Sequence, residues 1–179
     1  MSISLRDSRT RRLCLDAMLL CGALMLSYLE VLLPLGSAIP LPGFRLGLAN
    51  LVVTAVFCLV SPIDAAIVSA ARIMIMGVLF GSVTSLYFSA LGGIFAYLML
   101  LLLSKIGRRC SFFGVSVLCA AAYNTGQIFA AMTLFGTALI TSYLPALLLA
   151  SALYGGAVGC VLNLCMPRFS ALFERRRGI

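Results

Sequence analysis

The chain has 179 residues, of which 63% are apolar and only 10% are charged, and its mean hydropathy is strongly positive. An ordinary soluble domain is roughly half apolar and about a quarter charged, so the composition excludes a chain that folds mainly in water. A membrane-spanning helix needs about 20 mainly apolar residues, and about six such helices with short connections occupy nearly the whole length. We therefore expect a single integral membrane domain over residues 1–179.

The net charge of +8 does not indicate nucleic-acid binding, because a nucleic-acid-binding module gathers its basic residues on one face or stripe. Here eleven of the 13 basic residues lie outside the apolar runs: Arg6, Arg9, Arg11, Arg12, Lys105, Arg108, Arg109, Arg168, Arg175, Arg176 and Arg177. Cytoplasmic loops of membrane proteins carry such an excess of Lys and Arg. The sequence predicts a multi-pass protein of the cell (inner) membrane with both termini in the cytoplasm and no nucleic-acid partner.

Proline and glycine divide the apolar sequence into runs, and each run predicts one transmembrane helix. The expected fold class is therefore all-α, a polytopic membrane bundle of about six transmembrane helices. The segment 46–60 is short for a span, Ser61-Pro62 marks a tight turn, and Pro167 is expected to end the last helix. The expected helices cover residues 13–35, 46–60, 63–80, 84–103, 113–135 and 143–166.

Residues that carry catalysis or bind metals are scarce. The chain has no histidine, and its seven cysteines include no CxxC pair, so a zinc site is not expected. Its only lysine, Lys105, does not follow a glycine-rich phosphate-binding loop, and its five acidic residues are scattered instead of clustered for magnesium and diphosphate chemistry. We therefore expect no metal, no cofactor and no catalytic residue, in a protein that is not an enzyme.

Ionisable side chains inside a bilayer need a partner, water or a nearby interface. Asp16 and Asp64 lie near the cytoplasmic ends of their expected helices, where a structural charge costs little. Two interpretations remain open for Glu30, Arg45 and Arg72. Glu30 pairs with one arginine as a structural bridge, or the three residues leave a net positive site that faces outward and suits a carboxylate or phosphate.

Polar side chains also gather near the middle of the expected helix 113–135. Asn124 and Gln127 are three residues apart and Tyr123 precedes Gln127 by four, so all three share one helix face. Amides at this depth commonly hydrogen-bond to neighbouring helices. The alternative is that they line a ligand cavity.

Two stretches of the sequence resemble a known family. Residues 42–50, which read Pro-Gly-Phe-Arg-Leu-Gly-Leu-Ala-Asn, resemble the segment that enters helix 2 of bacterial membrane proteins named the Gx transporter family or heptaprenyl diphosphate synthase component I. The segment Tyr123-Asn124-Thr125-Gly126-Gln127 resembles their helix 5 signature, and Arg72 followed by Leu79-Phe80-Gly81 resembles their helix 3. The similarity covers about Leu13 to Met166. Tyr123 stands where the family often has a histidine.

The resemblance implies a six-helix layout similar to the substrate-binding S components of energy-coupling-factor transporters. Such subunits bind a micronutrient near the outer surface and depend on a separate membrane coupling subunit and ATPase subunits. Many dock through an alanine repeat in helix 1, of which this chain has only Ala17 and Cys21 at the right spacing. The candidate ligand-binding residues are Glu30, Arg45, Asn50, Arg72, Tyr123, Asn124 and Gln127.

Three functions follow as hypotheses. The first is a substrate-binding membrane subunit of a transporter, which captures a small anionic ligand from the outer side and depends on partner subunits for energy. The second is a non-catalytic membrane component associated with heptaprenyl diphosphate synthase and with prenyl-lipid or quinone metabolism. The third is a secondary transporter driven by an ion gradient, with Glu30 as the proton-carrying residue.

Overall fold

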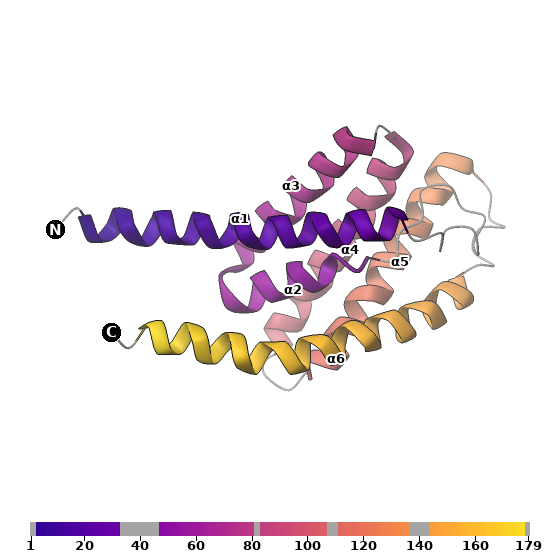
Figure 1. Cartoon of the computed structure of the whole chain (residues 1–179). Helices are drawn as coiled ribbons and strands as arrows, with labels where there is room; N and C mark the ends of the chain where they lie inside the picture. The colour runs from indigo at the N-terminus through magenta and orange to yellow at the C-terminus, as the bar shows by residue number, and fades with distance from the viewer. Residues whose placement is uncertain (1–2, 33–46, 81–82, 107–110, 137–143, 178–179) are drawn as a thin grey trace.

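The computed structural model describes residues 3–32, 47–80, 83–106, 111–136 and 144–177, which form an all-α bundle (Figure 1). The described residues contain six helices, in agreement with the expected fold class. Their bounds are α1 Ile3–Leu32, α2 Asn50–Leu59, α3 Pro62–Phe80, α4 Val83–Ile106, α5 Phe112–Phe135 and α6 Leu144–Arg177.

The first and last helices are longer than their apolar segments. α1 begins at Ile3 instead of residue 13, because hydropathy marks the part of a helix that lies in lipid and the polar residues before it still favour helix. The expectation that Pro167 ends the last helix was wrong, since α6 continues to Arg177. A proline inside a membrane helix is tolerated where its surroundings compensate for the lost hydrogen bond, and Arg, Ala, Leu and Glu in the following segment are strong helix formers.

Among the described helices, five are long and apolar enough to cross a membrane, and α2 is the exception. Large apolar side chains on the long helices face outward, as lipid contact requires; examples are Met18, Val78, Leu102 and Leu153. The ten residues of α2 extend only about 15 Å, roughly half of the hydrocarbon thickness. By itself α2 is therefore too short to cross the hydrocarbon layer.

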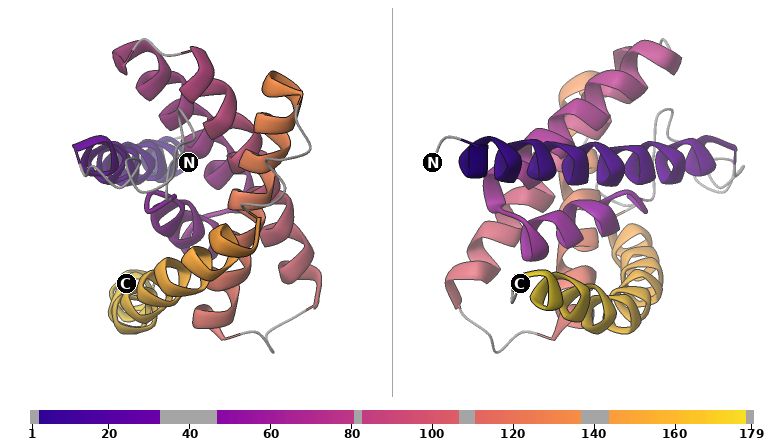
Figure 2. Two further views of the ribbon diagram at one scale, coloured as in Figure 1. Left: turned by 90° about the vertical axis from the view of Figure 1, so that its right-hand side faces the viewer. Right: turned by 60° about the vertical axis from the view of Figure 1, so that its left-hand side comes forward.

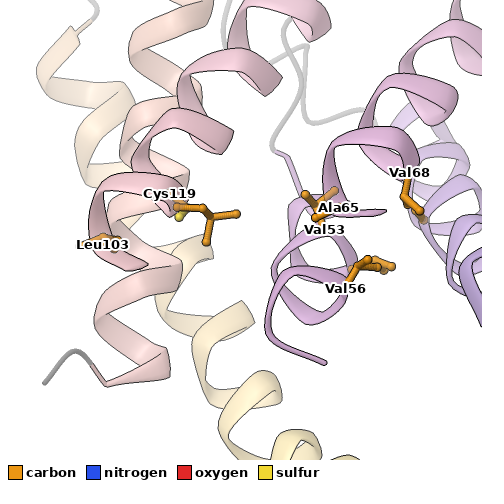
Figure 3. Close-up of a cluster of buried hydrophobic side chains, with 9 residues drawn as sticks. Val53, Val56, Ala65, Val68, Leu103 and Cys119 are labelled. Atoms are coloured by element: carbon orange, nitrogen blue, oxygen red, sulfur yellow. The ribbon is translucent and has the colours of Figure 1, made fainter. Parts of the chain in front are cut away.

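The short helix α2 lies at the centre of the bundle and contacts each of the other described helices. Its side chains Val52, Val53 and Val56 are buried and form one hydrophobic cluster with residues of α1, α3, α4 and α5. In this cluster Val53 lies beside Ala65 of α3, as Figure 3 shows. Packing of these side chains against the neighbouring helices explains why a run of apolar residues too short for a span forms a stable helix here.

Polar contacts from α1 hold both ends of the segment that contains α2. At one end the guanidinium of Arg12 donates to the carboxylate of Asp64 at the start of α3, with both Nε and Nη2 lying 2.7 Å from Oδ2. At the other end the carboxylate of Glu30 accepts a hydrogen bond from the backbone N–H of Leu48. Arg12 and Glu30 are 18 residues apart along α1, about 27 Å at 1.5 Å per residue, which approaches the hydrocarbon thickness of about 30 Å.

The start of α1 and the end of α6 lie at the same end of the molecule, and α2 lies between these two helices (Figure 1; Figure 2, right). An even number of crossings places both ends of a chain on one side of a membrane. The arrangement therefore agrees with termini on the same side, while their cytoplasmic orientation stays a prediction from the charge distribution.

Helices α4, α5 and α6 pack at distances that only glycine permits. A Cβ atom on Gly126 of α5 would lie 2.7 Å from the backbone oxygen of Leu91 in α4. A Cβ atom on Gly155 of α6 would lie 2.8 Å from the Cα atom of Val117 in α5. Small residues allow such close approach of membrane helices, and as a result α4, α5 and α6 form a closely packed group.

Replacing Gly126 by alanine should therefore destabilise the bundle, because the backbone of α4 must move to admit the methyl group. We expect a loss of about 1–3 kcal/mol, the usual cost of overpacking. Unfolding in SDS, followed by far-UV circular dichroism, measures this loss. The matched control is Gly114→Ala in the same helix, where nothing lies within 4 Å of the added Cβ; equal stability of the two variants would contradict the prediction.

Candidate functional site

The sequence-predicted residues Arg72 and Tyr123 line one small pocket inside the bundle. Arg72 of α3 is 4% exposed and Tyr123 of α5 is 1% exposed. Ser27 of α1 and Ser89 of α4 are buried beside them, and the remaining wall is apolar. The space left between these side chains holds roughly one water molecule. Four helices thus meet at a guanidinium and three hydroxyl groups.

All the polar groups in this pocket can donate a hydrogen bond. The guanidinium of Arg72 is a fixed cation with only donors, and the hydroxyls of Ser27, Ser89 and Tyr123 donate or accept. In the described part of the chain no carboxylate lines the pocket, and Oγ of Ser89 has no hydrogen-bond partner there. This combination suits an anionic group, because a buried cation is stabilised by an opposite charge that accepts its hydrogen bonds. We call this site the Arg72 pocket.

The ring of Tyr123 lies between Gly92 of α4 and Gly47, which precedes α2. A Cβ atom on Gly92 of α4 would lie 2.8 Å from Cε2 of the ring, and a Cβ atom on Gly47 would lie 3.1 Å from Cδ1 on the opposite edge. Gly47 has a φ of +80°, a left-handed conformation that favours glycine. Both glycines therefore leave the space that the aromatic ring fills.

A second small pocket lies on the α2 side of Tyr123, between α2, α5 and α6. Gly47 and Asn50 line it together with residues of α5 and α6, which include Ser116 and Tyr154. It also has space for about one water molecule. Nδ2 of Asn50 is buried without a hydrogen-bond partner among the described residues. Tyr123 lines the Arg72 pocket and contacts Gly47, which lines the second pocket, so the ring lies next to both spaces.

The two amides of α5 differ in their surroundings. Nδ2 of Asn124 donates to the backbone oxygen of Leu147 in α6 at 3.1 Å, so this side chain links two helices, and a role for Asn124 in ligand binding stays a prediction. Gln127 is 1% exposed, and neither its amide oxygen nor its nitrogen has a hydrogen-bond partner within the described ranges. A role for Gln127 in ligand binding stays a prediction.

Glu30 of α1 lies beside the N-terminal end of α2, where it accepts a hydrogen bond from Leu48, and it does not line the Arg72 pocket. A carboxylate in this position also interacts favourably with the positive end of the helix dipole. Asp64, expected to be structural, is paired with Arg12. Arg45 lies outside the described residues, so its part in the site stays a prediction.

Sequence reasoning missed the two serines of the Arg72 pocket. Ser27 and Ser89 lie in apolar runs, where serine is common at helix contacts, and neither belongs to a recognisable motif. The spacing of Arg72, four residues before Met76 and one turn from Ser69 on the same helix, places it on the buried face of α3. The partners on α1 and α4 follow only from the packing of the helices.

The bundle and its buried cationic pocket define a polytopic helical membrane protein with a polar interior site. Residues 19–165 match the family described as heptaprenyl diphosphate synthase component I. The match covers most of the chain, and the chain belongs to this family, as the segments at residues 42–50 and 123–127 predict. No curated protein and no solved structure matches the chain.

The fit of Tyr123 against Gly92 can be tested with two neighbouring variants. Gly92→Ala should displace the buried ring, because Gly47 blocks its opposite edge. In Gly93→Ala the nearest atom to the added Cβ is the flexible Cδ1 methyl of Ile73 at 3.0 Å, and Oγ of Ser69 lies at an ordinary contact distance of 3.7 Å. We expect Gly92→Ala to lose about 1–3 kcal/mol more than Gly93→Ala. The measurement is the temperature at which half of the detergent-solubilised protein leaves the monodisperse peak in size-exclusion chromatography.

A second substitution shows whether the ring of Tyr123 causes the stability loss in Gly92→Ala. Tyr123→Leu shortens the side chain and should restore part of the stability that Gly92→Ala removes, because contacting residues show non-additive effects. If the effects of Gly92→Ala and Tyr123→Leu simply add, the two positions do not contact each other.

Proposed function

We propose that the protein is a ligand-binding membrane subunit of a transporter, similar to the S components of energy-coupling-factor transporters, and that it captures a small anion. The observation that carries the proposal is the buried guanidinium of Arg72, surrounded by hydroxyl groups from α1, α4 and α5. Family membership is compatible with this role.

The chemistry of the pocket supports an anionic ligand. A guanidinium binds a carboxylate or a phosphate through two parallel hydrogen bonds, and the hydroxyls of Ser27, Ser89 and Tyr123 accommodate the remaining lone pairs. The low dielectric of a membrane bundle strengthens these interactions relative to water. Ionisable residues that face the interior of a bundle are typical of substrate and ion pathways.

Transport through this site needs other proteins in the proposal. The chain has no phosphate-binding loop before its single lysine, so ATP-driven transport would depend on ATPase subunits and on a membrane coupling subunit. The lipid bilayer surrounds the exposed apolar residues of the long helices, and the coupling subunit would compete with lipid for part of that surface.

A thermal-shift series tests the ligand class. Purified protein is heated with inorganic phosphate, inorganic diphosphate, acetate or succinate, and the melting temperature is read by size-exclusion chromatography. We expect at least one anion to raise the melting temperature of the wild type, because ligand that binds only the folded state stabilises it. Arg72→Gln should abolish the shift, and Arg72→Lys should reduce it, because lysine lacks the planar fork.

The matched control is Lys105→Gln, which removes one positive charge from an exposed position in the last turn of α4. It should leave the anion shift unchanged. If Arg72→Gln folds and keeps the full shift, Arg72 is not in the binding site. If none of these anions acts and native mass spectrometry detects no bound small molecule, the proposed function is wrong.

The family description favours a second candidate function. A component I implies a second component, so the chain would be a non-catalytic membrane partner of a heptaprenyl diphosphate synthase, in prenyl-lipid or quinone metabolism. This function predicts that the solubilised protein co-purifies with a soluble prenyl diphosphate synthase subunit, and that Arg72→Gln leaves this association intact. Association without any bound anion would favour this candidate over the transporter subunit.

A further inference from the structure

A turn formed by residues 47–49 precedes α2, and one of its backbone N–H groups, that of Leu48, donates to a residue of another helix. The N–H groups of Asn50, Leu51 and Val52 donate to the carbonyls of Gly47, Leu48 and Ala49 at 2.9 to 3.1 Å. The N–H of Leu48 instead donates to the carboxylate of Glu30 in α1. A backbone donor buried in a membrane protein requires an acceptor, so Glu30 fixes the position of this turn.

The same turn forms one wall of the space that holds Tyr123. Gly47 lies at the ring edge formed by Cδ1 and Cε1, and the side chain of Asn50 lies next to Gly47. The opposite wall is Gly92 of α4, whose Cα would lie 2.9 Å from a Cβ on Gly126 of α5. The α4 wall is therefore fixed by backbone packing. The α2 wall is held by the Glu30 contact and by the apolar core around the first turns of α2.

The ring must move before a ligand can enter. The Arg72 pocket and the pocket on the α2 side each hold roughly one water molecule, and a carboxylate or phosphate group with the rest of its molecule is larger. Because the α4 wall is fixed by backbone packing, movement of the ring toward the α2 side requires movement of the Gly47 turn. Such a movement would join the two pockets and place the donor Nδ2 of Asn50 in the same cavity as Arg72.

We propose that Glu30 is a positioning residue that holds the Gly47 turn against Tyr123 and so keeps the Arg72 pocket closed until ligand enters. The inference rests on the proposed function. The joined cavity would take an anion whose uncharged part accepts a hydrogen bond from Asn50. Glu30 acts through the backbone of α2 and touches no ligand.

The decisive variants are Glu30→Gln and Glu30→Met. Glutamine keeps an oxygen that accepts the hydrogen bond of Leu48, whereas methionine has a similar length and no comparable acceptor. Hydrogen–deuterium exchange of the peptide around residues 47–52 reports the turn directly. We expect exchange at least about tenfold faster in Glu30→Met, the factor expected for a lost hydrogen bond to a charged group, and exchange close to the wild type in Glu30→Gln.

Access to the pocket gives a second measurement. Ser89→Cys places a thiol in the pocket wall, and mass spectrometry follows its labelling by an anionic methanethiosulfonate reagent. Labelling should be slow in the Ser89→Cys background, faster by a similar factor after Glu30→Met, and slow again after Glu30→Gln. Peptides of α4 and α5 around Gly92 and Gly126 serve as the internal reference for global unfolding.

The outcomes separate this inference from the proposed function. If Glu30→Met leaves both exchange and labelling unchanged, Glu30 does not hold the turn, even when Arg72→Gln abolishes anion binding. If Glu30→Gln behaves like Glu30→Met, the charge of Glu30 matters and not its acceptor atom, as in a proton-carrying role. If exchange rises throughout α4 and α5, Glu30 stabilises the whole bundle, and the positioning role is wrong.

Discussion

The structure depends on how a short helix is held across a membrane bundle. The ten residues of α2 extend about half of the hydrocarbon thickness, so the polar backbone at both ends needs partners inside the protein. Glu30 accepts from Leu48 at one end. At the other end the Ser61 hydroxyl accepts from the N–H of Ile63, and the hydroxyl of Tyr97 donates to the carbonyl of Pro62. These contacts supply hydrogen-bond partners for polar groups at the two ends of α2.

The same constraint links the fold to the site. Because α2 is central, the Gly47 turn that precedes it contacts Tyr123, and Tyr123 forms a wall of the Arg72 pocket. The two sides of the ring differ physically. On the α4 side backbone approaches backbone at glycines, and displacement there would separate two helices. On the α2 side the glycine turn is held by the Glu30 contact and by the apolar core around the first turns of α2, without the backbone-to-backbone approach found on the α4 side.

Much of the fold could be predicted because apolar runs and breakers reflect lipid contact directly. The helix ends at Ile3 and Arg177 could not, since hydropathy does not record helix that continues into water. In the candidate site, Arg72 could be predicted because a charged side chain within an apolar run is costly and is therefore a candidate functional residue. Ser27 and Ser89 were not, because their significance comes from three-dimensional neighbours. Glu30 was recognised as unusual, but its acceptor role requires knowledge of a backbone donor 18 residues away.

The distribution of polar groups bears on the choice between a ligand-binding subunit and a membrane scaffold. A scaffold for a soluble enzyme would present polar recognition groups on its surface, where an interface is formed. Among the side chains whose burial the structure describes, many large apolar ones face outward, while Arg72, Gln127 and Asn124 are buried. A charge enclosed by four helices contributes nothing to an external interface. Ionisable residues that face the interior of a bundle are typical of substrate and ion pathways, so the position of Arg72 supports the proposed binding function inside the bundle.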